Sequence, residues 1–284
     1  MYIKVKNLNY TYSKDLPNQT KALDDVSFGI EKNSILGVAG HTGSGKSTLL
    51  QMLNGLLRPD DGEIFIGEDC ITEKNFPLVN IRKKVGLVFQ YPEYQLFEET
   101  VRKDVIYGPK NLGIEDEKEL EEIARDSISK VGLDYEIIKD RSPFELSGGQ
   151  KRRVAIAGVI AMKPEVLILD EPTAGLDPES RHELINMIQN IQKNENMILI
   201  FVSHNMNDIA KLADKMIVLD RGKIAMEGTP REVFAKKDEL NSIGLGVPKV
   251  TEIMHRISEE IDGVKTDVLT LDEALEEIVR VLND

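Results

Sequence analysis

The sequence contains one cysteine, no long apolar run and fewer basic than acidic residues, and each shortage excludes a class of protein. Cys70 has no partner for an intrachain disulfide, which is typical of a protein in a reducing compartment. Residues 1–6 lack the apolar stretch of a signal peptide. The best apolar run, residues 154–162, is far shorter than the roughly 18 residues that cross a bilayer. We therefore expect no direct membrane span, so that a role at a membrane would require another subunit.

The shortage of basic residues gives the 284-residue chain a formal net charge of −13. Lysine and arginine supply most of the affinity of proteins for DNA and RNA, so we expect no nucleic-acid partner. Residues 241–284 carry four basic and ten acidic side chains, a net charge of −6, and are interpreted as a solvated acidic region. Hydrophobic residues make up 41% of the chain, which is enough for a full globular core.

Short apolar runs alternate with helical patterns along the chain, which predicts an α/β fold with a parallel sheet. The runs interpreted as buried strands lie at residues 34–39, 85–89, 166–169, 197–202 and 216–219. The helical patterns between them lie at residues 46–57, 150–162, 179–192 and 206–212. Residues 1–30 alternate in the manner of strands around a turn, and we assign them to an N-terminal antiparallel β-subdomain.

A charged amphipathic helix at residues 115–131 interrupts this alternation and indicates an inserted α-helical subdomain at about residues 91–163. Near the C-terminus, a linker at residues 244–248 is followed by two helical patterns, at residues 251–261 and 271–282. These patterns predict a small C-terminal helical appendage, which is a candidate dimerisation element. The predicted division is one main domain and one appendage, at residues 1–240 and 241–284.

A glycine-rich segment matches the P-loop pattern, with a strand before it and a helix after it. Glycines let successive backbone N–H groups converge on the β-phosphate of a nucleotide, aided by the N-terminus of the helix behind them. Lys46 would bring its charge to the β- and γ-phosphates, and the Ser47 hydroxyl would be a ligand of Mg²⁺. His41 occupies a free position and is interpreted as a loop residue rather than a catalyst. The predicted ATP-binding residues of this segment are Gly40, His41, Thr42, Gly43, Ser44, Gly45, Lys46, Ser47 and Thr48.

A second segment suited to anions lies far along the chain, at the start of the helix predicted from Gln150. Ser147 can cap this helix, and Gly148 and Gly149 allow an anion to approach its free N–H groups. Alone, the segment predicts only a well-capped helix. Because the P-loop already holds the chain's own nucleotide, we expect Ser147, Gly148, Gly149 and Gln150 to contact the ATP of a partner subunit in a head-to-tail dimer.

The residues 146–150, Leu-Ser-Gly-Gly-Gln, resemble the signature of the ATP-binding-cassette (ABC) family. That resemblance implies a P-loop NTPase fold and hydrolysis of ATP with Mg²⁺. Asp170 and Glu171, at the end of an apolar strand, resemble the family's Mg²⁺ ligand and general base, although two such acids can also cap a turn. His204 is similar to the switch histidine that contacts the γ-phosphate. Gln90 resembles the glutamine that contacts Mg²⁺ and senses the γ-phosphate.

Two further residues match the family by position. Asp177 resembles the residue that communicates across the dimer, and Asp177 followed by Pro178 is also a good helix start. Tyr12 fits the adenine-stacking aromatic better than Tyr10, which falls closer to the strand pattern; either ring can instead serve packing.

Within the ABC family, the chain resembles the ATPases of energy-coupling factor importers, which take up vitamins or transition metals. The resemblance extends over residues 1 to about 240, and the stretches that carry it are residues 91–97, 100–101 and 108–111. Two further stretches, residues 40–43 and 152–158, are similar to the second of the two ATPase paralogues of that group.

This resemblance implies a second ABC ATPase subunit, a transmembrane coupling subunit and a substrate-binding membrane subunit as partners. It also implies a peripheral position on the cytoplasmic face of the cell membrane. We expect Glu93 and Glu98 to attract basic residues of the coupling subunit, unless they are simply exposed loop acids. The alternatives are the ATPase of another ABC importer or exporter, and a soluble ABC protein of DNA repair or translation. The transported molecule and the choice between homodimer and heterodimer are not encoded in these motifs.

Overall fold

A six-stranded sheet forms the centre of the computed structural model, which describes residues 1–283. Its strand order is β10-β9-β3-β8-β7-β6, and all neighbours are parallel except β10 with β9. The strand bounds are β3 Ile35–Ala39, β6 Val85–Val88, β7 Val166–Asp170, β8 Ile198–Val202, β9 Lys215–Asp220 and β10 Lys223–Gly228. The prediction of a parallel sheet built from short apolar runs is therefore confirmed.

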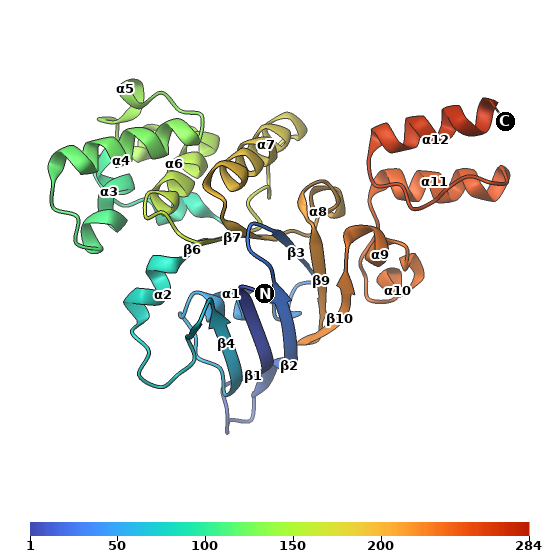
Figure 1. Cartoon of the computed structure of the whole chain (residues 1–284), viewed down its shortest axis with the longest axis horizontal. Coiled ribbons are helices and arrows are strands. Elements are labelled where there is room, and N and C mark those ends of the chain that lie inside the picture. Colours follow the sequence, from blue (N-terminus) through green and yellow to red (C-terminus); the bar gives the residue numbers. More distant parts are fainter. Residues whose placement is uncertain (284) are drawn as a thin grey trace.

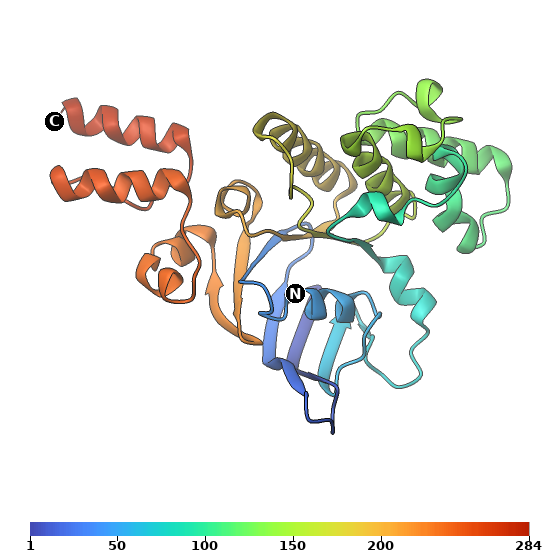
Figure 2. The ribbon, with the colours of Figure 1, turned by 180° about the vertical axis from the view of Figure 1, so that it is seen from behind.

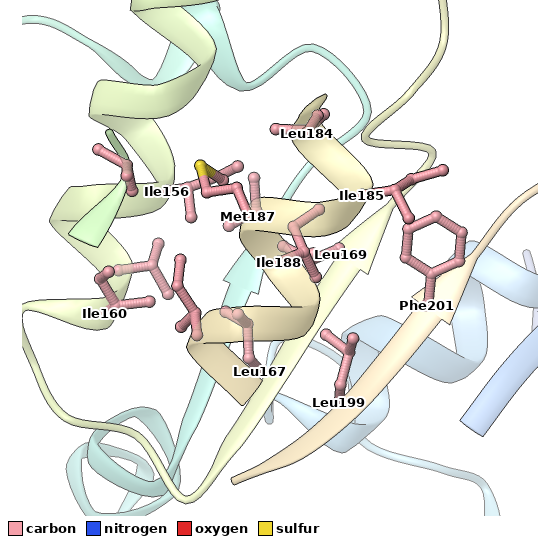
Figure 3. Close-up of a cluster of buried hydrophobic side chains, with 14 of the residues drawn as sticks. Ile156, Ile160, Leu167, Leu169, Leu184, Ile185, Met187, Ile188, Leu199 and Phe201 are labelled. Atoms are coloured by element: carbon pink, nitrogen blue, oxygen red, sulfur yellow. The ribbon is translucent and has the colours of Figure 1, made fainter. Parts of the chain in front are cut away.

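Both faces of this sheet are covered, so its strands are apolar at nearly every position. Successive side chains of a strand point to opposite faces, and Leu167 and Leu169 of β7 pack on one side while Val166 and Ile168 pack on the other. Figure 3 shows the first side, where helices lie over β7 and β8 with the side chains of both interdigitated. The helices on this side are α6 Gly148–Ile160, α7 Pro178–Glu195 and α8 Met206–Leu212.

The opposite face is covered by α1 Lys46–Leu53 and by a second sheet of strand order β2-β1-β4-β5. Neighbouring strands of this sheet are antiparallel, as predicted for the N-terminal segment. The strand bounds are β1 Ile3–Tyr12, β2 Thr20–Ile30, β4 Asp61–Ile66 and β5 Asp69–Cys70. The predicted helix at 46–57 is shorter in the structure, because Gly55 adopts a left-handed conformation (φ 72°).

A group of helices lies beside the sheet at its β6 edge (Figures 1 and 2). It includes the helix predicted at 115–131, which begins at Glu117 and ends at Lys130, and its capping Asp116 accepts a hydrogen bond from the Lys118 amide. The helices before and within this group are α2 Leu78–Lys84, η1 Pro92–Gln95, α3 Val101–Asn111, α4 Glu117–Lys130, α5 Tyr135–Ile138 and η2 Pro143–Glu145.

The C-terminal segment forms four helices, of which the last two lie side by side away from the sheet (Figures 1 and 2). The bounds are α9 Pro230–Phe234, α10 Lys237–Ser242, α11 Lys249–Glu260 and α12 Leu271–Asn283. The last two pack on a small apolar cluster of their own, made of Val250, Met254, Val268 and Ala274. Within the part of the chain that the structure describes, none of the helices combines the length and apolar character needed to cross a bilayer.

Candidate nucleotide site

The loop between β3 and α1 has a backbone that only glycine adopts readily. Gly40, Gly43 and Gly45 have φ values of 151°, 81° and 106°. A Cβ atom on Gly40 would lie 2.5 Å from the Leu219 carbonyl oxygen, and one on Gly45 would lie 2.5 Å from the Ala22 carbonyl oxygen. The sequence pattern of this loop is therefore required by its close contacts with the β9 end and with β2. It leaves a cradle in which backbone N–H groups can approach an anion.

A cavity of about 330 Å³ opens above this loop, at the carboxyl ends of the parallel strands, where α/β sheets bind ligands. It is lined by Tyr12, Thr20, Lys21, Ala22, Thr42, Gly43, Gly45, Lys46, Ser47, Thr48, Gln90, Asp170 and Glu171. The structure thus brings together residues that lie up to 159 positions apart in the sequence. A second hollow, of about 420 Å³ around Tyr2 and Glu165, lies at the opposite ends of the strands and contains no residue of the loop.

Lys46 is held inside the loop before any ligand arrives. Its ammonium group donates hydrogen bonds to the carbonyl oxygens of Gly40 (2.6 Å) and His41 (3.0 Å). Burial lowers the pKa of Lys46, and the neighbouring carboxylates of Glu171 and Asp170 partly oppose that shift. A half-buried ammonium group with only carbonyl partners is well suited to receive phosphate oxygens.

The predicted magnesium ligands line the same cavity. The Ser47 hydroxyl lies 3.4 Å from Asp170 Oδ2, and Gln90 lines the cavity after the end of β6. Burial, followed by the charge of Glu171, raises the pKa of Asp170, so a cation at this position would relieve an unfavourable carboxylate. Residues 1–283 contain no cluster of three His, Cys, Asp or Glu side chains suited to a metal. The set of one hydroxyl, one amide and one carboxylate fits Mg²⁺ that takes its other ligands from phosphate and water.

Glu171 follows Asp170 in a left-handed conformation (φ 51°), which is rare for a residue other than glycine. The Glu171 amide donates to the Val202 carbonyl oxygen (3.0 Å), which ties this residue to the end of β8. Its carboxylate accepts hydrogen bonds from His204, at 2.6 Å from the ring Nδ1 and 3.3 Å from the backbone amide. The structure therefore places the predicted general base and the predicted switch histidine in direct contact.

The two candidate tyrosines differ in their surroundings. Tyr12 is the last residue of β1 and lines the cavity, with its hydroxyl 3.2 Å from Thr48 Oγ1. Tyr10 packs against the apolar core and meets the Tyr12 ring edge to face, with the ring centres 4.8 Å apart. Tyr12 is thus the one of the two rings that lines the cavity, and its stacking on adenine stays a prediction.

The signature segment lies outside this cavity. Ser147 is the N-cap of α6, as predicted: its hydroxyl accepts from the Gln150 amide (3.3 Å) while the Gln150 side chain accepts from the Ser147 amide (3.1 Å). A Cβ atom added to Gly148 or Gly149 would meet open space. Ser147, Gly149 and Gln150 line a separate hollow of about 210 Å³. One chain therefore carries two anion-suited sites that share no lining residue.

Asp177 is the N-cap of α7, and its carboxylate accepts hydrogen bonds from the Glu179 and Ser180 amides, both at 3.0 Å. The interpretation of Asp177 as a helix start is thus confirmed. Its communication across a dimer stays a prediction.

The turn that follows Glu171 is fixed by two buried charged residues that sequence reasoning did not single out. Arg152 of α6 donates to the carbonyl oxygens of Pro172 (2.8 Å) and Ala174 (3.0 Å). Asp208 of α8 accepts from the Thr173 hydroxyl (2.8 Å). Arg152 is one of three consecutive basic residues at 151–153 and stood in the sequence only as part of the resembling stretch 152–158, whereas Asp208 gave no signal.

The prediction for Glu93 needs correction. Its carboxylate is turned inward, 3.8 Å from the Arg152 guanidinium, and its Oε2 atom is buried without a hydrogen bond. Besides Glu99, this loop presents three aromatic side chains to solvent: Tyr91, Tyr94 and Phe97. Glu98 is half-buried, and its amide donates to Asp104.

The sequence profile of the family described as ABC transporter matches residues 23–174, which is more than half of the chain. Two curated relatives cover almost all of it, and both are named energy-coupling factor transporter ATP-binding protein EcfA2. The protein of Clostridioides difficile (strain 630) is 56% identical over 99% of this chain and 98% of its own length. The protein of Clostridium tetani (strain Massachusetts / E88) is 51% identical over 100% of this chain and 98% of its own length.

Solved structures agree with this assignment. The structure of cbiO1 from Clostridium perfringens, described as part of the ABC transporter complex cbiONQ, matches with a TM-score of 0.76 and 35% identity. It aligns with 90% of this chain and 98% of its own. The dimeric structure of MJ0796, a bacterial ABC transporter cassette, matches with a TM-score of 0.72 and 27% identity over 80% of this chain and 98% of its own. The chain therefore belongs to the ABC transporter family, among the ATP-binding proteins of energy-coupling factor transporters.

Proposed function

We propose that this chain binds MgATP and hydrolyses it to ADP and phosphate as one half of a head-to-tail pair that drives an energy-coupling factor importer. The observation that carries the proposal is the separation of the P-loop cavity from the signature hollow on a single chain. Gly148 and Gly149 face open space, so the surface that a partner's phosphates would contact is free. A site that encloses the phosphates on both sides therefore requires two chains.

The chain's own residues divide the work at the cavity. Ser47, Gln90 and Asp170 would hold Mg²⁺, which when bound neutralises the charge of the phosphates. Lys46 exchanges its two loop carbonyl partners for phosphate oxygens. Tyr12 offers its ring to the adenine.

Glu171 is the candidate general base, because its carboxylate ends the strand beside Asp170 and is oriented by His204. When a γ-phosphate draws the His204 ring toward itself, Glu171 becomes free to accept a proton from the attacking water. Closure by the partner's signature segment would exclude bulk water, which strengthens these electrostatic interactions.

The membrane subunits would dock on the aromatic surface around the loop after Gln90. Tyr91, Tyr94 and Phe97 are more than half exposed there. Large apolar side chains that remain in water mark interaction sites. We infer a peripheral position on the cytoplasmic face of the membrane, with a transmembrane coupling subunit seated on this surface and a substrate-binding subunit beyond it. The cargo class, vitamin or transition metal, follows from the resemblance alone.

The C-terminal appendage would hold two ATPase subunits together, as a homodimer or with a paralogue. One stripe along α12 is left uncovered, with side chains 56–76% exposed: Leu271, Leu275, Val279 and Leu282. Four apolar side chains at helical spacing have no partner within residues 1–283, so a second subunit is their proposed cover. Truncation after Gly246 should yield monomers in the absence of ATP; apo dimers that persist would count against this role.

The proposed head-to-tail pair of chains is tested with the variant Glu171→Gln, which should bind ATP without hydrolysing it and so trap the closed state of the pair. Mass photometry of this variant should show dimers with MgATP, either alone or with the ATPase subunit that copurifies from membranes. The matched control adds Gly149→Glu, which fits the single chain but places a carboxylate against the partner's phosphates. The proposal fails if the trapped variant binds MgATP and stays monomeric in both preparations.

A further inference from the structure

The P-loop residue His41 makes two hydrogen bonds through its ring, one within the loop and one to a distant strand. Its Nδ1 atom lies 2.7 Å from the Thr42 carbonyl oxygen, and its Nε2 atom lies 2.8 Å from Asp220 Oδ1. Asp220 is the last residue of β9, 179 positions along the chain. Both side chains are half-buried. The ring thus bridges the phosphate loop and the sheet behind it.

The chemistry of the two acceptors determines how many protons the ring needs. A carbonyl oxygen only accepts hydrogen bonds, so Nδ1 must carry a proton to bond Thr42. An ionised carboxylate also only accepts, so Nε2 must carry one to bond Asp220. The ring that makes both bonds is therefore an imidazolium paired with a carboxylate, and a neutral ring keeps only one of them.

The bond to Thr42 completes a set of contacts that occupies three consecutive loop carbonyls. Lys46 takes the carbonyl oxygens of Gly40 and His41, and the His41 ring takes that of Thr42. These oxygens carry partial negative charge, which would repel a phosphate if they faced it. Holding them there in the nucleotide-free loop leaves the N–H groups to be presented to an anion, and the His41 contact can remain when Lys46 turns to the phosphates.

Asp220 is a firm anchor for this bridge because its turn is already bonded on both sides. The Gly222 amide donates to the Ser44 carbonyl oxygen (3.0 Å), and the Asp24 amide donates to the Gly222 carbonyl oxygen (2.8 Å). The turn therefore joins the P-loop to β2 of the antiparallel sheet. The charged groups that face His41 are Asp220 from β9 and, across the shared loop carbonyl, Lys46 from α1.

We propose that His41 is a positioning residue for the phosphates of the nucleotide: by bridging Thr42 and Asp220, it holds the P-loop in its phosphate-receiving form. This rests on the proposed function, because it presumes that the loop binds ATP. Breaking either end of the bridge should therefore weaken ATP binding, and breaking both ends should weaken it no further.

The test measures the Kd for MgATP by calorimetry in a Glu171→Gln background, with and without His41→Asn and Asp220→Asn. Each single substitution should raise the Kd about fivefold, the scale of a partly exposed ion pair. The double variant should bind no more weakly than either single variant, because each substitution already breaks the bridge. His182→Asn is the matched control, since His182 lies on α7 and contacts Lys211 of α8, and it should leave the Kd unchanged.

Nitrogen NMR of the His41 ring supplies a readout that does not depend on activity. Asp220→Asn should move the Nε2 resonance of His41, and His182→Asn should leave it in place. The inference is overturned if Asp220→Asn leaves the His41 ring signals unchanged, or if His41→Asn binds MgATP as tightly as its parent. If no variant binds MgATP while each stays folded, it is the proposed function that fails.

Discussion

Arg152 offers the sharpest test of how the catalytic turn is held. Its side chain is 7% exposed and lies between three elements: α6, the turn after Glu171 and the loop after Gln90. Two hydrogen bonds join it to Pro172 and Ala174, and an ion pair joins it to Glu93. The substitution Arg152→Met removes the charge and the donors while keeping most of the aliphatic volume.

The contacts set the size of the effect. Each hydrogen bond from the charged Arg152 side chain to a backbone carbonyl contributes about 1.5 kcal/mol net, the lower end for a charged donor. Stranding the Glu93 carboxylate adds about 1 kcal/mol, below the range for fully buried pairs because Glu93 is 25% exposed and 3.8 Å away. The expected loss is therefore about 4 kcal/mol of unfolding free energy, or a decrease in Tm of about 8–16 °C for a protein of this size. The double variant Arg152→Met/Glu93→Gln should recover part of that loss, because no charge is left unpaired.

The same change should reach catalysis through geometry. Pro172 and Ala174 follow Glu171 directly, so a loosened turn lets the Glu171 carboxylate move from its place beside the nucleotide. Small displacements of a catalytic group are costly, and we expect kcat of the assembled ATPase to fall by about tenfold or more. Arg152 does not line the cavity, so the Kd for MgATP should stay within about twofold of the original value, since binding contacts are kept.

Arg153 is the matched control, because it is the neighbouring arginine on the same helix and bonds a carbonyl and a carboxylate of its own. It donates to the Val131 carbonyl oxygen (3.0 Å) and to Glu183 (2.9 Å), without contact to the turn. Arg153→Met should lower Tm but preserve kcat. The reasoning is refuted if Arg152→Met keeps the original Tm, or if the two variants lose kcat equally.

Other perturbations probe the remaining parts of the site. Glu171→Gln should slow single-turnover hydrolysis by about 100-fold or more, the scale of a lost general base, and rapid turnover would assign the base elsewhere. Gly149→Ala should leave Tm unchanged or slightly higher, since the added Cβ meets open space and alanine favours a helix, while ATPase activity of the pair falls; full activity would remove the signature segment from the site. Burial raises the pKa of Asp170 above its unfolded value, so the stability that protonated Asp170 contributes is lost as pH rises. Asp170→Asn should therefore raise the Tm of the nucleotide-free protein at pH 7, with a smaller gain at pH 4. A gain in Tm that is independent of pH would contradict this cause. Leu275→Glu should abolish apo dimers in light scattering, and unchanged dimers would place the contact elsewhere.

The elements near the nucleotide were predictable because their sequence constraints are local. The strand, glycine loop and helix at 35–53 must follow one another for the loop to form, so one short segment carries the whole pattern. Ser147 is similar, since a cap and the helix it begins are separated by a few residues. Periodicity found α8 at its observed bounds, Met206–Leu212.

Contacts between distant segments were not predictable, since residue types do not reveal which side chains meet. Nothing in the sequence joins Asp220 to His41 or Asp208 to Thr173. Both pairs depend on the strand order of the sheet, which places the end of β9 beside the P-loop and α8 beside the turn after β7. A single sequence without pairing information leaves that order open.

The inward direction of Glu93 shows why charge is a weaker guide to a docking surface than exposure. An acid in a loop suggests attraction for a basic partner, but a buried arginine nearby competes for it before any partner arrives. Arg152 is only 7% exposed and is stabilised by a counter-charge within the fold, whereas Tyr94 is 84% exposed and remains available to a partner. The same loop therefore divides its side chains between two tasks: Glu93 faces the catalytic turn, and the aromatic residues face outward. A membrane subunit that presses on those aromatic rings would act on the loop that carries Glu93, and through Arg152 on the turn that follows Glu171.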